Sequence, residues 1–196
     1  QDRDTLLARI DATSGKLTAL VADPAACRAI LDDGGIANRP EAATGTGACR
    51  LGDRTRISPD ATLRYRPAAP VATCAVHAGL LLWQREVVEP TAQRHFDKGV
   101  IAIDHFGTAS CRRMRGGGGS GWSEHASGNA IDIAAFRLAG GRQVRVLGDW
   151  QGDARARAFL REVRDGACRI FGTTLSPDYN AAHRDHFHLD MADRST

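Results

Sequence analysis

The sequence predicts an α+β fold in which a small antiparallel sheet is flanked by helices. Runs typical of strands, with β-branched or alternating apolar residues, occupy 99–113, 130–150 and 186–191. Apolar residues spaced three or four positions apart, typical of helices, occupy 72–94 and the segment after Asp153. These patterns lack the strand–helix–strand rhythm that builds a parallel sheet, so we expect antiparallel pairing.

Size and charge restrict the architecture and the class of partner. With 196 residues, 42% of them hydrophobic, the chain can bury one sizeable core. We expect residues 1–70 to form an N-terminal extension packed on a core of residues 71–196, so that the two make one compact unit. The net charge of +3, from 26 basic and 23 acidic residues, argues against nucleic acid as a partner.

Hydropathy and cysteine usage bear on the compartment. No run of 18 apolar residues occurs, so we expect no transmembrane segment. The chain opens with the polar run QDRDTLLARID and shows no signal peptide, as a processed, mature chain would. Its five cysteines lack CxxC spacing, which argues against a cysteine zinc site. Two disulfides and one free thiol can be arranged among the five cysteines in 15 ways, and we favour Cys27–Cys49 and Cys111–Cys168. Such bonds would suit a secreted or periplasmic protein; buried free thiols in a cytosolic protein are the alternative.

The first 70 residues predict helices and then loops. Residues 1–22 predict a short helical lead. A second helix opens near Asp23–Pro24 and ends at Gly34–Gly35, where glycine can adopt a positive φ. Residues 36–70 are rich in Gly, Pro, Thr and Arg without a sustained period, which predicts loops and short strands.

The middle of the chain predicts a helix, a strand and a glycine-rich loop. Within 72–94 the apolar stripe of the helix is formed by Val76, Leu80, Trp83 and Val87. The strand GVIAIDHFGTASCRR follows, and then the run RGGGGSGW. We expect residues 116–121 of this run to be mobile and to border the functional site.

The last third predicts a hairpin, a helix and a final strand. The segment AIDIAAFRLAGGRQVRVLGDW turns around Gly140–Gly141. A helix begins at about Asp153, a suitable N-cap, and one of its faces carries Phe159, Leu160, Val163, Ala167 and Phe171. After the loop SPDYNAAHRD, the segment HFHLDM predicts a short strand.

Two of these strands each carry polar side chains on one face. Successive side chains of a strand point to opposite faces, so Asp132 points away from its isoleucine neighbours, and His186 and His188 point away from the phenylalanine and leucine. His125 precedes Asp132 by seven positions in SEHASGNAIDI. Two imidazoles and one carboxylate, with one open position, form the ligand set of a catalytic zinc site.

The segments SEHASGNAIDI and HRDHFHLD resemble a metallopeptidase superfamily, the LAS superfamily, which contains the D-alanyl-D-alanine carboxypeptidases, the murein endopeptidases and the hedgehog signalling domain. The chain from about Cys27 is more similar still to the bacterial extensin-like C-terminal domain family, through TCAVHAGLLLW, SCR, AFLREVRDGAC and LSPDYNAAH. The resemblance implies a hedgehog/DD-peptidase-like fold in which residues 71–196 form the LAS-type core.

The resemblance also implies roles for individual residues. His125, Asp132 and His188 would bind Zn²⁺. His186, the first histidine of the His-x-His pair, would be either the acid/base residue or a residue placed beside the developing oxyanion.

Two further residues are candidates for the catalytic base. His183 stands five positions before the last ligand, where some members of the superfamily also have a histidine. Other members carry a glutamate three positions before that ligand, where this chain has the shorter Asp185. Strand alternation would turn Asp185 away from the metal, so we rank His186 first, His183 second and Asp185 third.

Three residues are candidates for supporting roles. Arg112 matches an arginine that contacts substrate or the developing oxyanion in relatives; a solvated arginine is the alternative. Ser123 could bind a peptide carboxylate, or it could be a loop hydroxyl or cap. Asp190, on the face of the last ligand, could orient its imidazole, or it could be a surface carboxylate.

The resemblance implies a zinc metallopeptidase that hydrolyses an amide bond in D-amino-acid-containing peptidoglycan peptides, as a DD- or LD-endopeptidase or a carboxypeptidase. A periplasmic or secreted bacterial protein is expected. One alternative is a catalytically inactive zinc-containing module that binds peptidoglycan or protein, because the hedgehog branch uses this scaffold for recognition. Another is a disulfide-stapled structural domain without metal.

Overall fold

The computed structural model describes residues 17–61, 63–114 and 121–192. Its α-helices are α2 (Pro24–Asp33), α3 (Cys74–Trp83), α4 (Glu89–Phe96), α5 (Val146–Asp149) and α6 (Ala154–Ala167). Its strands are β1 (Asn38–Glu41), β2 (Arg54–Ile57), β3 (Arg64–Arg66), β4 (Val100–Gly107), β5 (Ala130–Leu138), β6 (Gln143–Arg145), β7 (Thr173–Leu175) and β8 (Phe187–Asp190). Short 3₁₀ helices include η4 (Glu124–Ala126) and η5 (Ala181–His183).

The main sheet has the strand order β3-β4-β5-β8-β7, with β6 also paired to β5. All of its pairs are antiparallel except β3–β4. Parallel strands need a crossover connection, and α3 and α4, which lie between β3 and β4 in sequence, provide it. The expected α+β class, with an antiparallel sheet and flanking helices, is confirmed.

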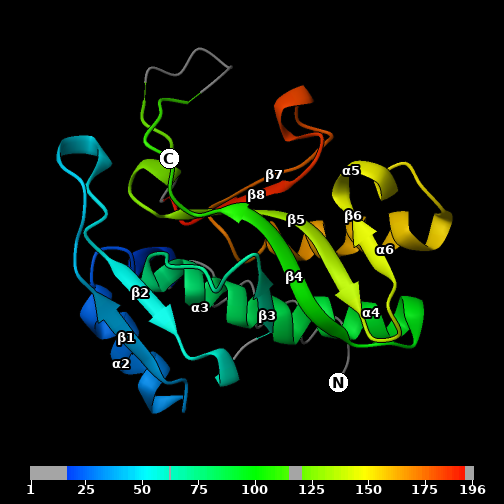
Figure 1. The fold of residues 1–196 in the computed structure, drawn as a ribbon, viewed down its shortest axis with the longest axis horizontal. Coiled ribbons are helices and arrows are strands. Elements are labelled where there is room, and N and C mark those ends of the chain that lie inside the picture. Colours follow the sequence, from blue (N-terminus) through cyan, green and yellow to red (C-terminus); the bar gives the residue numbers. More distant parts are fainter. Residues whose placement is uncertain (1–16, 62, 115–120, 193–196) are drawn as a thin grey trace.

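The N-terminal part of the chain forms a second, two-stranded sheet from β1 and β2. Figure 1 shows this two-stranded β1–β2 ribbon, together with α2, at one end of the main sheet. β3 nevertheless joins the main sheet, so the segment 1–70 contributes a strand to the core of residues 71–196.

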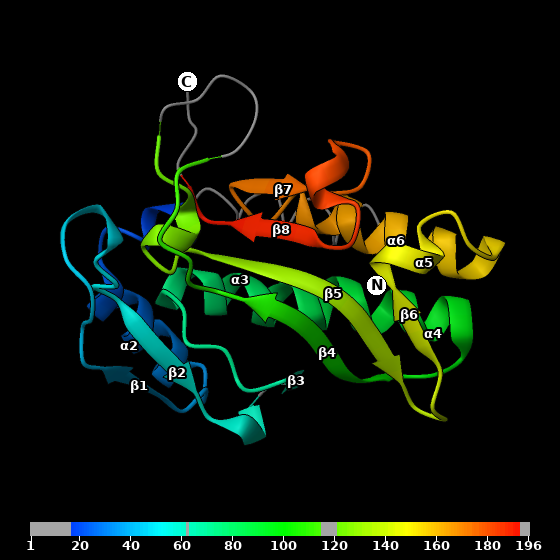
Figure 2. The ribbon, with the colours of Figure 1, turned by 45° about the horizontal axis from the view of Figure 1, so that its top comes forward.

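Helices α3, α4 and α6 lie on one side of the main sheet (Figures 1 and 2). Their apolar side chains share one buried cluster with those of β5 and β8, and the largest fully buried members include Trp83, Phe136 and Phe159. The Trp83 indole Nε1 donates a hydrogen bond of 2.8 Å to the Val163 carbonyl, which ties α3 to α6. One face of the sheet is therefore committed to the core.

The helical stripe predicted within 72–94 is confirmed, with an interruption. Val76, Leu80, Trp83 and Val87 are all buried. Residues Gln84–Val88 form a π-helical turn between α3 and α4. The side-chain spacing cannot reveal such a turn, because the stripe continues through it.

The predicted helix and hairpin ends are also confirmed. Asp23 Oδ1 accepts a hydrogen bond from the Ala26 amide at the start of α2, and Gly35 after its end has φ 75°. Asp153 caps α6 through the amides of the helix's first turn. The β5–β6 turn contains two glycines with positive φ, Gly140 and Gly141.

The expected disulfides are wrong. The structure joins Cys27 to Cys74 and Cys49 to Cys111, and it leaves Cys168 as an exposed free thiol. Both bonds connect the N-terminal segment to the core, whereas the predicted Cys27–Cys49 bond would have closed a loop within that segment. Packing of α2 on α3 brings Cys27 to Cys74, and no local pattern in the sequence signals that contact.

Two other expectations fall largely outside the described residues. Of the predicted helical lead 1–22, the described part includes a helical turn at 17–19. The expected mobility of residues 116–121 concerns a segment of which only Gly121 is described. Across the described ranges, no helix combines the length and the apolar character needed to cross a membrane.

Candidate metal centre

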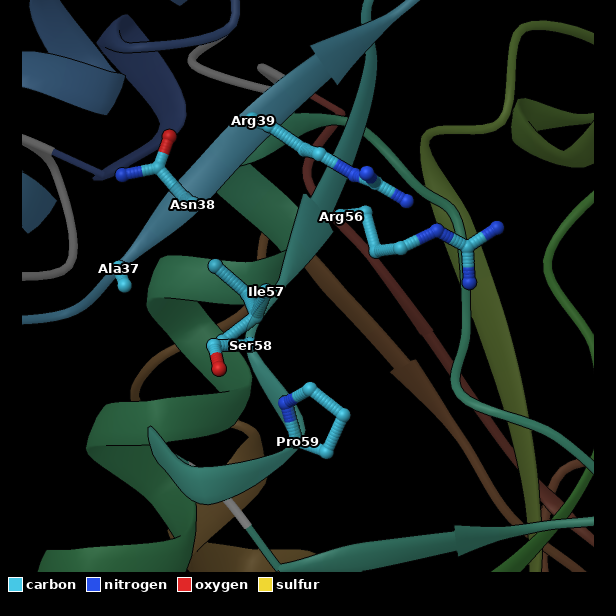
Figure 3. Close-up of a pocket in the computed structure, with 7 residues that line it drawn as sticks. All are labelled: Ala37, Asn38, Arg39, Arg56, Ile57, Ser58 and Pro59. Carbon is cyan, nitrogen blue, oxygen red and sulfur yellow. The ribbon is translucent and has the colours of Figure 1, made fainter.

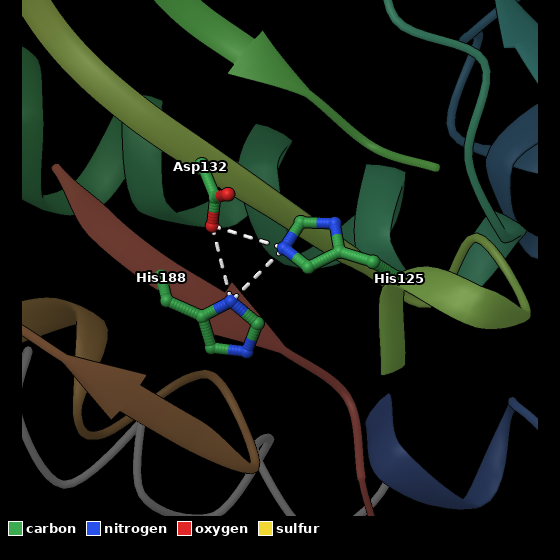
Figure 4. Close-up of side chains that lie close together, drawn as sticks. All are labelled: His125, Asp132 and His188. Atoms are coloured by element: carbon green, nitrogen blue, oxygen red, sulfur yellow. Dashed lines mark hydrogen bonds and ion pairs between the residues drawn. The ribbon is translucent and has the colours of Figure 1, made fainter. Parts of the chain in front are cut away.

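Three side chains lie close together and form a three-donor centre: His125 from η4, Asp132 from β5 and His188 from β8 (Figure 4). Asp132 Oδ1 lies 3.0 Å from His125 Nε2 and 3.0 Å from His188 Nδ1. The two imidazole nitrogens are 3.1 Å apart. Asp132 and His188 are direct partners in the β5–β8 register, so backbone pairing itself sets their separation.

Strand alternation places these side chains on the face opposite the core. Ile131 and Ile133, on either side of Asp132, are fully buried in the helix-covered cluster. The neighbours of His188 on β8, Phe187 and Leu189, are buried there too. The polar face predicted from AIDIAAF and HFHLD is therefore present, and the two strands present their donors side by side.

His125 is positioned by its local backbone. It lies in η4, where Ser123 Oγ accepts a hydrogen bond from the His125 amide. Its ring Nδ1 lies 3.1 Å from the Thr108 carbonyl, which can only accept, so Nδ1 carries the hydrogen. The Nε2 atom is thereby the ring nitrogen that faces Asp132. Gly128, with φ 73°, turns the chain between the two donors.

His188 is oriented by a buried carboxylate. Its Nε2 donates to Asp190 Oδ2 at 2.9 Å, and Asp190 is only 1% exposed. The Nδ1 atom is thereby the one that faces Asp132. Asp190 orients the imidazole as one reading of the sequence proposed; the alternative, a surface carboxylate, is wrong.

The electrostatics of the centre favour a cation. Burial raises the pKa of Asp132, but hydrogen bonds with His125 and His188 outweigh burial and hold the pKa well below its ordinary value. Burial lowers the pKa of His188, but hydrogen bonds with Asp132 and Asp190 outweigh it and raise the pKa to about 9. Both shifts reflect the strong attraction of positive charge to this point.

The donor set fits zinc. Tetrahedral zinc with bonds of about 2.0–2.1 Å places its ligand atoms roughly 3.3–3.4 Å apart. The distances of 3.0 to 3.1 Å between the three donor atoms would need to expand by only a few tenths of an ångström. The three atoms lie at hydrogen-bond distances here, and metal binding releases protons from such ligands.

His186 and Asp185 form a pair beside the centre. His186 Nδ1 donates to Asp185 Oδ1 at 2.9 Å, and its Nε2 lies 3.6 Å from Asp132 Oδ1. Asp185 is not among the three donors and precedes the first residue of β8, Phe187. The imidazole of His186 therefore lies between Asp185 and the donor Asp132.

His183 and Arg112 complete the surroundings. The His183 ring lies 5.1 Å from that of His186 and 6.1 Å from that of His188. Burial, followed by repulsion from these two histidines, lowers the pKa of His183 to about 4, and the charge of Arg112 acts in the same direction. Arg112 is thus close enough to His183 for its charge to act on that imidazole.

The sequence predicted the three residues that the structure brings together but did not predict several of their neighbours. Thr108 contributes a backbone carbonyl, which leaves no trace in residue type. Asn180 Oδ1 lies 2.7 Å from His183 Nδ1, and the loop position of this residue gave no signal. The Ser123 hydroxyl caps the turn that carries His125, which is the cap reading that the sequence left open.

Two hollows lie in other parts of the molecule. One, of about 290 Å³, borders the β1–β2 ribbon, where the cross-strand partners Arg39 and Arg56 extend to the same side (Figure 3). The other, of about 340 Å³, lies between Ile57, Tyr65 and His77. Neither is lined by a residue of the three-donor centre.

Comparison with known proteins identifies the family. No curated protein and no solved structure matches the chain. The family model described as "Extensin-like protein C-terminus" matches residues 25–196, which include both disulfides and the whole three-donor centre. The chain therefore belongs to the extensin-like protein C-terminus family.

Proposed function

We propose that this protein is a zinc-dependent peptidase that hydrolyses an amide bond in D-amino-acid-containing peptides of peptidoglycan. The observation that carries the zinc site is the convergence of His125, Asp132 and His188 within 3.1 Å of one another. The reaction class and the substrate rest on the resemblance of the His-x6-Asp and His-x-His segments to the superfamily of D-alanyl-D-alanine carboxypeptidases and murein endopeptidases.

Zinc, when bound, acts as a Lewis acid that lowers the pKa of water from ~15.7 toward ~7 and polarises a carbonyl group. The protein's own contribution to proton transfer is His186. Its Nδ1 hydrogen is held by Asp185, so Nε2 presents a lone pair toward the three-donor centre. That nitrogen accepts a proton from the attacking water and donates it to the leaving amine.

Hydrolysis balances with water as the co-reactant. The water oxygen forms a bond to the carbonyl carbon, the C–N bond breaks, and the proton on His186 Nε2 passes to the departing nitrogen. Arg112 supplies positive charge where the carbonyl oxygen becomes negative. His183, with its pKa lowered to about 4, is neutral, so it can donate a hydrogen bond to the substrate or accept one from it.

Two disulfides are consistent with a protein that folds outside the cytoplasm. We extend this to a periplasmic or secreted location in a bacterium, because peptidoglycan lies there.

One observation favours a second candidate, an inactive zinc-containing module that binds peptidoglycan or protein. Asp185 bonds to His186 instead of facing the centre, where relatives use a glutamate base. If His186 cannot replace that base, the centre would hold zinc without turnover.

The decisive experiment measures zinc content and then turnover. Protein purified without chelators should contain about one zinc per chain, and His188→Ala should lose it. Zinc-loaded wild type should release muropeptides from purified peptidoglycan, whereas His186→Ala should retain zinc and lose ~10²-fold or more in kcat.

His95→Ala is the matched control, because this histidine pairs with Glu162 on the helical side of the molecule. It should retain both zinc and activity. Zinc-loaded wild type that releases nothing but sediments with sacculi would favour the binding module. Protein that binds no zinc would contradict both candidates and favour a disulfide-stapled structural domain.

A further inference from the structure

Four rings form a continuous run beside the three-donor centre. Successive centroids are 5.9 Å apart for Phe106 and His186, 5.1 Å for His186 and His183, and 5.7 Å for His183 and Tyr179. The two histidines are partly buried, whereas Phe106 is 62% exposed and Tyr179 is 60% exposed. The run therefore ends in an exposed aromatic ring at both extremities.

The two exposed rings lie at opposite ends of this run, where Phe106 contacts His186 and Tyr179 contacts His183. Phe106 lies on β4, whereas Tyr179 lies on the connection from β7 to β8. Of the donors, Asp132 lies on β5 and His188 on β8. The strand order is β4-β5-β8-β7, so the run of rings crosses the strands. The three centroid separations of 5.1 to 5.9 Å place the two end rings at most about 17 Å apart, the length of about five extended residues.

Exposed aromatic rings at such positions are suited to contact with a ligand. The flat apolar faces of Phe106 and Tyr179 can cover aliphatic or sugar CH groups, and each ring contacts a histidine beside the centre in an edge-on arrangement. A substrate that ended at the cleaved residue would reach only one of the two rings. A substrate that continues on both sides would cover both.

We propose that Phe106 and Tyr179 are positioning residues that hold the substrate on either side of the three-donor centre, and that the enzyme is an endopeptidase. Its substrate is then a cross-linked peptidoglycan peptide, with chain on both sides of the cleaved amide. This inference rests on the proposed peptidase function and names the class of bond that it cuts.

The test compares two substrates, a purified cross-linked muropeptide dimer and an uncross-linked monomer whose stem peptide ends in D-alanyl-D-alanine. Zinc-loaded wild type should cleave the dimer. Phe106→Ala and Tyr179→Ala should each raise the KM for the dimer by about tenfold and change kcat by less than about threefold. Phe106→Tyr and Tyr179→Phe should restore the KM.

Binding provides a readout that does not depend on turnover. Calorimetry with the dimer and metal-free protein should show about tenfold weaker binding for each alanine variant. Leu147→Ala is the matched control, because Leu147 on α5 is also 62% exposed but lies on another element, and it should change neither KM nor Kd.

The outcomes separate this inference from the proposed function. Wild type that removes only the terminal residue of the monomer would overturn the endopeptidase assignment and leave the peptidase intact. Alanine variants with an unchanged KM and Kd, or with a loss confined to kcat, would overturn the positioning role. Wild type that cleaves neither substrate would contradict the peptidase itself and the endopeptidase assignment with it.

Discussion

Asp190 is a buried side chain that contacts the candidate zinc site without being one of its three donors. Its Oδ2 accepts a hydrogen bond of 2.9 Å from His188 Nε2, and the residue is only 1% exposed. We predict that Asp190→Asn weakens zinc binding by about 10- to 100-fold, because the amide no longer fixes the imidazole orientation through a charged hydrogen bond. Competition with a fluorescent chelator measures this change.

Asp33→Asn is the control for that experiment, because Asp33 lies exposed at the end of α2. It should bind zinc as wild type does. Equal zinc affinity of the Asp190 and Asp33 variants would show that Asp190 does not support the ligand.

His77 makes a pH-dependent contribution to stability at a distance from the candidate site. Burial lowers its pKa from 6.5 to about 4, although the hydrogen bond to the Thr55 carbonyl opposes that shift. The unfolded chain therefore takes up a proton near pH 6.5, which the folded protein resists until about pH 4. The stabilisation is complete above pH 6.5 and is lost as the pH falls from 6.5 toward 4.

We predict that wild type loses roughly 2–3 kcal/mol more than His77→Gln in free energy of unfolding between pH 7.5 and pH 4.5. Glutamine can still donate to the Thr55 carbonyl but does not titrate. Urea unfolding of both metal-free proteins at the two pH values measures the difference. If the difference in free energy of unfolding between wild type and His77→Gln is the same at both pH values, the assignment to His77 is contradicted.

At the scale of elements, the packing of α6 against the π-helical turn depends on one missing side chain. A Cβ on Gly166 would lie 2.4 Å from Val87 Cγ1. Alanine normally stabilises a helix relative to glycine by about 1 kcal/mol. We predict that Gly166→Ala instead lowers the free energy of unfolding by about 1–3 kcal/mol, because neither element can move freely.

Urea unfolding checks this prediction, and a double-mutant cycle checks its cause. In a Val87→Ala background the penalty for Gly166→Ala should largely disappear. Gly148→Ala, in α5, should be harmless because no atom lies within 4 Å of the added Cβ. A stabilised Gly166→Ala protein would show that the two elements separate easily.

The strands and helices also show which features of the fold the sequence could predict. Period-two alternation placed Asp132 and His188 on the polar face correctly, because each strand must bury its other face. The caps of α2 and α6 were also predicted, since they depend on residues within one turn. The π-helical turn and the parallel β3–β4 pair were not, because neither alters the local spacing of apolar residues.

At the scale of the molecule, the Cys49–Cys111 disulfide connects the N-terminal segment to the candidate site. Cys111 lies in the segment whose Thr108 carbonyl accepts from His125 Nδ1 and whose Ser110 amide donates to the His125 carbonyl. We predict that replacing both cysteines with serine costs up to about 4 kcal/mol of stability and also weakens zinc binding, because the support of His125 loosens.

Removal of Cys27–Cys74 provides the comparison, because that bond lies between α2 and α3. It should lower the melting temperature to a similar extent but leave zinc affinity unchanged in the folded protein. Thermal melts and chelator competition measure the two effects. Equal loss of zinc affinity in the two double variants would contradict a specific role for Cys49–Cys111.

The order of the bonded cysteines along the chain has one more consequence. The bonds 27–74 and 49–111 overlap, so each loop contains one end of the other bond. A single proteolytic nick anywhere from residue 27 to residue 111 thus leaves the two fragments covalently linked. Such a nicked molecule would migrate as one species on a gel until a reductant separated it.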